Sequence, residues 1–122
     1  MRVAGIGFRS TATLASLQDA LARASTGGRV DLLATAEKKA SAPVAQELAA
    51  MLGLELRALA RQELARQDTL SHSERVAERF GTGSLCEAAA LAAAGTGARL
   101  LGPRAVSGDG MATAAIAIGR ER

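Results

Sequence analysis

Apolar residues follow two alternating patterns along the chain, short continuous runs and helical stripes. Residues 3–6 form an apolar run that stops at Gly7, which is typical of a buried strand. Leucines then recur at helical spacing over residues 14–21, and the glycine pair at 27–28 is expected to end that helix. The opening segment therefore predicts a strand followed by a helix.

The same alternation continues through the middle of the chain. Residues 30–34 predict a second strand, and Pro43 stands where proline is tolerated at the start of a helix. Apolar positions within 44–52 form a helical stripe that ends at Gly53. Residues 54–58 alternate between apolar and charged, so we expect a third strand with one face more exposed to solvent.

Helical signals dominate the next part of the chain. The polar segment 61–67 predicts a helical turn or an exposed connection, and Val76 and Phe80 share one side of a short helix. Ser84 and Glu87 have the spacing of a capping box ahead of an alanine-rich helix that ends near Ala94.

The closing segment predicts strands again. Residues 99–101 form a short strand, and 104–106 and 111–118 are expected to pair around the turn at 107–110. Early β-α-β alternation requires parallel strands, whereas the C-terminal hairpin requires antiparallel ones. We therefore predict one domain over residues 1–122, a three-layer α/β/α fold whose mixed, mainly parallel sheet carries helices on both faces.

Composition narrows the functional classes. The chain has 15 basic and 12 acidic residues, a net charge of +3, and 2% aromatic residues. Nucleic-acid binding requires clustered basic residues or stacking aromatics, so this class is disfavoured. No apolar stretch is long enough to span a membrane. The alanine-rich helices are compatible with a homo-oligomer as well as with one small core.

Cysteine usage and known motifs give further expectations. Cys86 is the single cysteine, and no secretory signal is recognisable, which favours a reducing cytoplasmic compartment. No second Cys or His stands at metal-ligand spacing, so no metal site is expected. The chain also lacks the motifs of a phosphate loop and of a dinucleotide site, and no cofactor is predicted.

The first candidate binding segment joins the first strand to the first helix. Gly7, Arg9, Ser10 and Thr11 would place a cation, hydroxyls and free backbone N–H groups at one strand end, where anions bind. A generic strand-to-helix turn explains the glycines equally well. A dinucleotide fingerprint would need glycine at position 10.

A second candidate segment follows the second strand. Thr35, Lys38 and Lys39 would lie at the sheet edge where open α/β folds place ligands. The alternative is a solvated loop. Two further basic or polar residues, Arg104 and Thr113, flank the predicted hairpin turn.

Candidate proton-transfer groups are few. His72 is the only histidine, and with Glu74 or Asp109 it could move protons near neutral pH. The simpler interpretation is that Ser71 or Ser73 caps the following helix and that Asp109 belongs to a hairpin turn.

The glycine-rich segment before the alanine-rich helix also has two interpretations. Gly83 and Ser84 could bind an anion at the new helix N-terminus, or they could serve the capping box alone. Cys86 lies in the first helical turn, where thiol pKa values can fall, although a buried and inert cysteine is the commoner case.

Four blocks of residues, in order along nearly the whole chain, resemble one known family. The first block, residues 5–9, is close to a G-I-G-C-R start, and the others lie within 34–54, 73–91 and 100–117. This set resembles the CobE and CbiG C-terminal family of cobalamin biosynthesis proteins. Phe8 replaces the usual cysteine, and Arg104 stands where a lysine is common.

The resemblance implies a role in building the corrin ring of cobalamin. It implies a carboxylate-rich corrinoid or precorrin as ligand and other corrin-pathway enzymes as partners. The residues agree with this ligand class, because a pocket built from Arg9, Lys38, Lys39 and Arg104 would suit the carboxylates and Phe8 would cover the ring face. A carrier or accessory role is expected. The alternative is an enzyme resembling the CbiG hydrolases that act on cobalt-precorrin-5A, although the chain lacks their extra N-terminal region.

Overall fold

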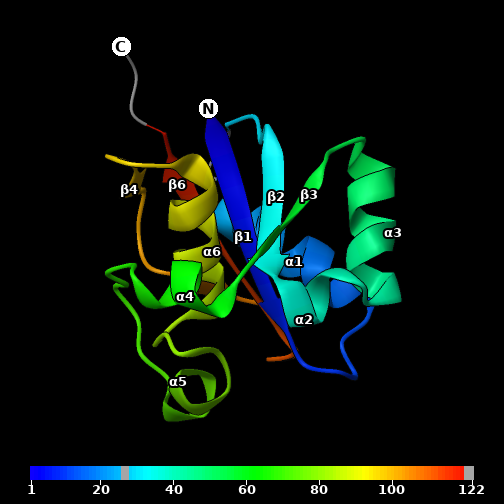
Figure 1. The fold of residues 1–122 in the computed structure, drawn as a ribbon. Helices are drawn as coiled ribbons and strands as arrows, with labels where there is room; N and C mark the ends of the chain where they lie inside the picture. Colours follow the sequence, from blue (N-terminus) through cyan, green and yellow to red (C-terminus); the bar gives the residue numbers. More distant parts are fainter. Residues whose placement is uncertain (26–27, 120–122) are drawn as a thin grey trace.

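The computed structural model describes residues 1–25 and 28–119 (Figure 1). The strands are β1 Arg2–Phe8, β2 Leu32–Ala36, β3 Leu56–Leu59, β4 Arg99–Leu100, β5 Ala105–Val106 and β6 Ala112–Ile118. The helices are α1 Leu14–Ala24, α2 Glu37–Ala40, α3 Pro43–Leu52, α4 Arg61–Ala65, α5 Glu74–Phe80 and α6 Leu85–Ala94.

All six strands join one mixed sheet in the order β3-β2-β1-β6-β4, with β5 pairing to β6. Parallel ladders join β1 to β2 and β2 to β3, whereas β6 runs antiparallel to β1, β4 and β5. The predicted three-layer α/β fold and its C-terminal hairpin are confirmed. The sheet is mixed, but it is not mainly parallel as we predicted: three antiparallel ladders stand against two parallel ones, because β6 pairs with β1 along the whole length of that strand and also with β4 and β5.

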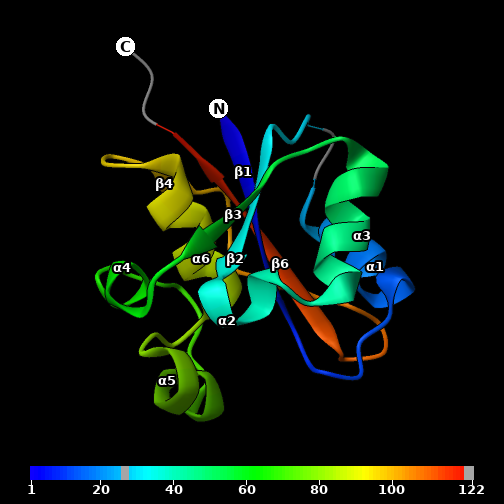
Figure 2. The same ribbon diagram turned by 45° about the vertical axis from the view of Figure 1, so that its right-hand side comes forward.

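Helices cover both faces of this sheet (Figures 1 and 2). On one face α1 and α3 pack through Leu17 and Leu48 against Ile6 of β1. On the other face α6 packs through its alanines, and α4 and α5 join the same apolar cluster through Leu64 and Phe80. Both faces of the central strands are therefore buried, which explains their continuous apolar runs.

Alanine and glycine bring α6 unusually close to the sheet. A Cβ atom added to Gly5 would lie 1.8 Å from the carbonyl oxygen of Cys86, so only glycine fits at this point of β1. Residues 88–90 of α6, all alanine, are fully buried at this interface. The small side chains allow a close approach that compensates for the scarcity of large apolar residues.

Element bounds differ modestly from the predicted ones. β2 and β3 each begin two residues later than expected, and β2 extends through the buried Thr35, whose hydroxyl donates to the Ile6 carbonyl at 2.8 Å. Helix α1 is capped by Thr13, which exchanges hydrogen bonds with Ser16. Gly27, one of the two glycines predicted to end this helix, lies outside the described residues.

Within the two described ranges, each helix is too short or too polar to cross a lipid bilayer.

Candidate functional site

A cleft of about 670 Å³ opens beside the carboxyl end of β1. Its walls come from the connection between β1 and α1, from α2 and α5, and from the segments that precede β5 and β6. These parts meet at the lower end of the sheet in Figure 1, near α5. Open α/β sheets bind ligands outside the carboxyl ends of their parallel strands, so the architecture favours binding here.

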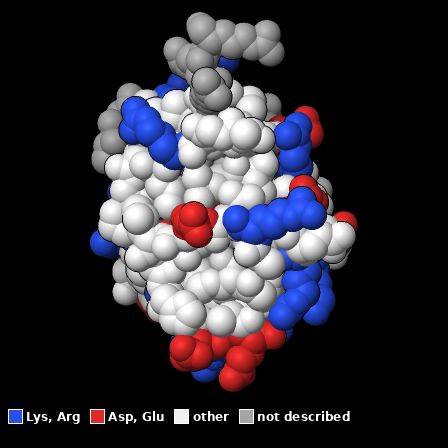
Figure 3. All heavy atoms as spheres, turned by 60° about the vertical axis from the view of Figure 1, so that its left-hand side comes forward, with Lys and Arg blue, Asp and Glu red and all other residues white. Residues whose placement is uncertain are grey.

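Among the residues that the structure describes, five basic side chains line this cleft, and no Asp or Glu does. The five are Arg9, Lys39, Arg75, Arg79 and Arg104. Every ion pair found within the described part of the chain involves other residues. On the face drawn in Figure 3, the largest acidic group lies at the bottom of the molecule, the level at which Figure 1 shows α5. The cleft is therefore a concentrated positive region on a chain with little net charge, and it attracts anions.

Lys39 and Phe8 interact with each other in the lining of the cleft. The Lys39 ammonium lies 5.0 Å from the centroid of the Phe8 ring, within the range of a cation–π interaction. Desolvation lowers the pKa of Lys39, and the positive charge of Arg79 lowers the pKa further. The ammonium is therefore partly desolvated and lies near one like charge, and an anionic ligand would offset both effects.

Apolar side chains complete the lining. Phe80 and Leu85 are buried beneath it, and Phe8, Val76 and Met111 are part of its surface. Gly7 lies at its base, where an added Cβ would come within 2.8 Å of the Thr113 hydroxyl. The cleft thus offers cations together with apolar contact area, which suits an anionic ligand that also carries apolar surface.

Most of the predicted binding residues meet in this cleft. Those that line it are Gly7, Phe8, Arg9, Ser10, Thr11, Lys39, Arg104 and Thr113. Lys38 lies instead in a second cleft of about 490 Å³, which shares Phe8, Ser10 and Lys39 with the first. Thr35 is fully buried in the sheet, and its hydroxyl is occupied by the Ile6 carbonyl.

Gly83 and Ser84 have structural contacts outside the cleft. The Gly83 carbonyl accepts a 2.7 Å hydrogen bond from the Ser73 amide, and an added Cβ would meet the His72 ring. Ser84 occupies the N-cap of α6, but its side chain makes no capping hydrogen bond. The predicted Ser84–Glu87 capping box is therefore wrong, because the Glu87 carboxylate turns toward two distant segments.

The three candidate proton-transfer residues do not converge. His72 Nε2 lies 2.9 Å from Glu74 Oε1 on an exposed surface, and neither residue lines the cleft. Ser73 caps α5, as the simpler interpretation expected.

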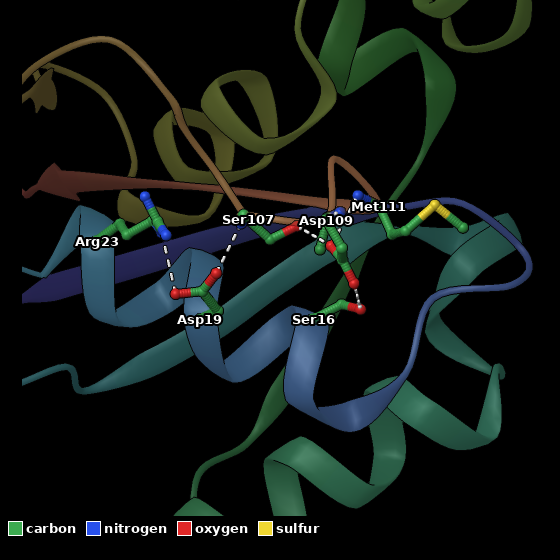
Figure 4. A network of polar contacts seen from close by, with 8 residues as sticks. Ser16, Asp19, Arg23, Ser107, Asp109 and Met111 are labelled. Atoms are coloured by element: carbon green, nitrogen blue, oxygen red, sulfur yellow. Dashed lines mark hydrogen bonds and ion pairs between the residues drawn. The ribbon is translucent and has the colours of Figure 1, made fainter.

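Asp109 anchors the turn of the β5–β6 hairpin to α1 (Figure 4). Its carboxylate accepts hydrogen bonds of 2.6 Å from Ser107 and Ser16, and one of 3.0 Å from the Met111 amide. These donors lower the pKa of Asp109 to about 2. A carboxylate so stabilised in its ionised form is a poor base near neutral pH.

Cys86 is a buried residue of α6. Burial raises the pKa of its thiol, so the lowered value considered for a helix N-terminus does not apply. Among the described residues, no three His, Cys, Asp or Glu side chains cluster in a way that could hold a metal ion.

The sequence reasoning missed Arg75 and Arg79, which supply two of the five cations. They stand four residues apart on α5, so both project from one side of that helix. Their spacing was available in the sequence, but basic residues on a short polar helix ordinarily form a solvated face.

Comparisons with known proteins agree on one family. Residues 2–117 match the family described as Cobalamin synthesis G C-terminus. The crystal structure of CobE, a protein from the cobalamin biosynthetic pathway, has 33% identity and a TM-score of 0.86, covering 100% of this chain and 93% of that one. The comparison with curated proteins finds no match.

Two further solved structures are similar. Cobalamin biosynthesis protein chiG from Agrobacterium tumefaciens is 37% identical with a TM-score of 0.72, covering 99% of this chain and 100% of that one. A putative cobalamin biosynthesis protein G homolog from Sulfolobus solfataricus has 16% identity and a TM-score of 0.70, covering 98% of this chain and 37% of that one, so it shares the fold. The chain therefore belongs to the CobE and CbiG C-terminal family of cobalamin biosynthesis proteins.

Proposed function

We propose that this protein binds a carboxylate-rich corrin-ring intermediate in the basic cleft. The observation that carries the proposal is the lining itself, in which the described residues combine five cations with apolar side chains and include no carboxylate. Corrin intermediates are large, flat and edged by several carboxylates. Membership in a cobalamin biosynthesis family supplies the ligand class, and the cleft supplies the complementary chemistry.

The arrangement of the cations suits several carboxylates at once. Arg104 and Arg9 come from segments 95 positions apart in the chain, and Arg75 and Arg79 come from α5 between them. Guanidinium groups bind carboxylates through paired hydrogen bonds, which fixes orientation as well as charge. Phe8, Val76 and Met111 would contact the apolar face of the ring.

A carrier role fits these features better than catalysis. Within residues 1–25 and 28–119, no His, Cys, Asp or Glu lines the cleft, and the candidate proton-transfer residues His72, Glu74 and Asp109 lie outside it. Corrin intermediates are labile, so sequestering one and passing it to a neighbouring pathway enzyme has a chemical purpose. We expect this to take place in the cytoplasm.

Optical titration tests the proposal. Cobyrinic acid, whose corrin ring carries free carboxylates, should give a saturable absorption shift, and the intact compound should be recovered afterwards. Its methyl ester keeps the ring but removes the negative charges, and we expect it to bind at least about tenfold more weakly, since charged hydrogen bonds contribute most. Equal binding of acid and ester would contradict recognition by the cations. A product of altered mass would instead indicate an enzyme.

A further inference from the structure

Glu87 is a fully buried carboxylate in the first turn of α6. Its Oε1 atom accepts hydrogen bonds from the amides of Leu70 at 2.7 Å and Ser71 at 2.8 Å. Its Oε2 atom accepts from the Ser71 hydroxyl at 2.7 Å and from the Arg104 amide at 2.8 Å. One side chain therefore holds two segments that are more than 30 positions apart in the sequence.

One of these segments lines the basic cleft through Arg104, and the other leads directly into a part of the chain that does, Ser73 and α5. Ser71 lies just before α5, the helix that carries Arg75 and Arg79. Arg104 is held through its own backbone amide, and its side chain lines the cleft. Glu87 itself is absent from the lining. Its hydrogen bonds thus connect the supports of three of the five cations without reaching the ligand space.

We infer that Glu87 is a positioning residue that fixes Arg104 relative to α5, and so sets the spacing of the cations that face the ligand. The inference rests on the proposed function of the cleft. A buried carboxylate is a poor means of stabilising a fold, because its desolvation offsets much of what its hydrogen bonds contribute. It is, however, an effective means of holding several N–H and O–H groups in fixed directions.

Glu87→Gln isolates the contact with Arg104. The glutamine amide has one acceptor oxygen, which can keep the two amides of Leu70 and Ser71, while its NH₂ group can donate to the Ser71 hydroxyl. That NH₂ group cannot accept from the Arg104 amide. We expect cobyrinic acid to bind about tenfold more weakly to this variant, as for loss of a charged hydrogen bond.

A double-mutant cycle shows whether Glu87 acts through Arg104. Arg104→Ala alone should weaken binding, and adding Glu87→Gln should weaken it little further, because the side chain being positioned is already gone. Fully additive losses, or an unchanged affinity in Glu87→Gln, would overturn the inference. Leu48→Ala is the control, since it opens the α3 core on the opposite face of the sheet and should lower stability without changing affinity.

Amide hydrogen exchange tests, without any ligand, whether Glu87 holds the Arg104 backbone in place. In Glu87→Gln the Arg104 amide should exchange faster relative to amides of β1, whereas Leu70 and Ser71 stay protected; Leu48→Ala should leave these ratios unchanged. Unaltered protection at Arg104 would overturn the positioning role. If the wild-type protein binds no corrinoid, the proposed function fails, and the exchange result still judges Glu87 separately.

Discussion

The Lys39 ammonium lies 5.0 Å from the centroid of the Phe8 ring, while the adjacent Lys38 lines a different cleft. Comparing these two neighbouring lysines therefore tests whether a ligand binds in the basic cleft or responds only to the overall charge of the surface. Lys39→Ala should weaken cobyrinic acid binding about tenfold, as for loss of a charged hydrogen bond, and Lys38→Ala should have a much smaller effect. Absorbance titration of both variants gives the comparison, and equal losses would mean that only net charge matters.

Binding should weaken at alkaline pH because of Lys39. Desolvation and the charge of Arg79 lower the pKa of this amine below its ordinary value of 10.5. As pH rises through the lowered pKa, the amine becomes neutral and loses its attraction for carboxylates.

Lys39→Arg is the matched variant for this pH dependence. Its guanidinium stays protonated, so the alkaline loss of affinity should be reduced. Titrations between pH 7 and pH 10 measure the effect, and identical profiles for the two proteins would rule out Lys39 as the titrating group.

Asp109 should stabilise the fold in a pH-dependent way. Hydrogen bonds from Ser107, Ser16 and Met111 lower its pKa from 3.8 to about 2. Its contribution is therefore fully present above pH 3.8 and is lost as pH falls toward 2. Urea unfolding should show the wild-type protein more stable than Asp109→Asn at pH 6, with the difference shrinking by pH 2.

Asp68→Asn serves as the control for that experiment. Asp68 is exposed, and no hydrogen bond to its side chain occurs among the described residues. A difference between wild type and Asp109→Asn that stayed constant from pH 6 to pH 2 would argue that the turn depends on side-chain shape rather than on charge.

Gly5→Ala should be strongly destabilising. The added methyl group would lie 1.8 Å from the Cys86 carbonyl oxygen, so α6 must move away from β1. We expect a loss of about 3 kcal/mol in the free energy of unfolding, at the upper end of overpacking effects. Gly102→Ala meets no atom within 4 Å and should be nearly neutral. A mild effect at Gly5 would mean that α6 can shift easily.

Most helices and strands of this fold could be predicted from the sequence, because the signals that define them are local. Glycine stops, the Ser73 cap and the closing hairpin all depend on neighbours within a few positions. The strand end at Gly7 to Thr11 was likewise recognisable, since a strand followed by a helix places its connection at the sheet edge.

Non-local contacts account for what the sequence missed. Ser84 and Glu87 have the spacing of a capping box, yet the partners of Glu87 lie 16 or 17 positions away. Lys38 and Lys39 are neighbours in sequence, and only the packing of α2 brings Lys39 into the lining of both clefts while Lys38 lines the second cleft alone. Arg75 and Arg79 line the same cleft as Arg104, but no local sequence pattern relates α5 to the segment around Arg104.

The position of β6 has a consequence for how the chain folds. β1 pairs with β2 on one side and β6 on the other, in a register that matches Arg2 with Ile118. The two strands are far apart in the sequence, so their pairing raises the contact order of the domain. Closing so long a loop costs conformational entropy, and folding is therefore expected to be slow. During translation, one edge of β1 stays unpaired until residue 118 leaves the ribosome. A nascent chain is therefore expected to depend on protection of that edge from aggregation.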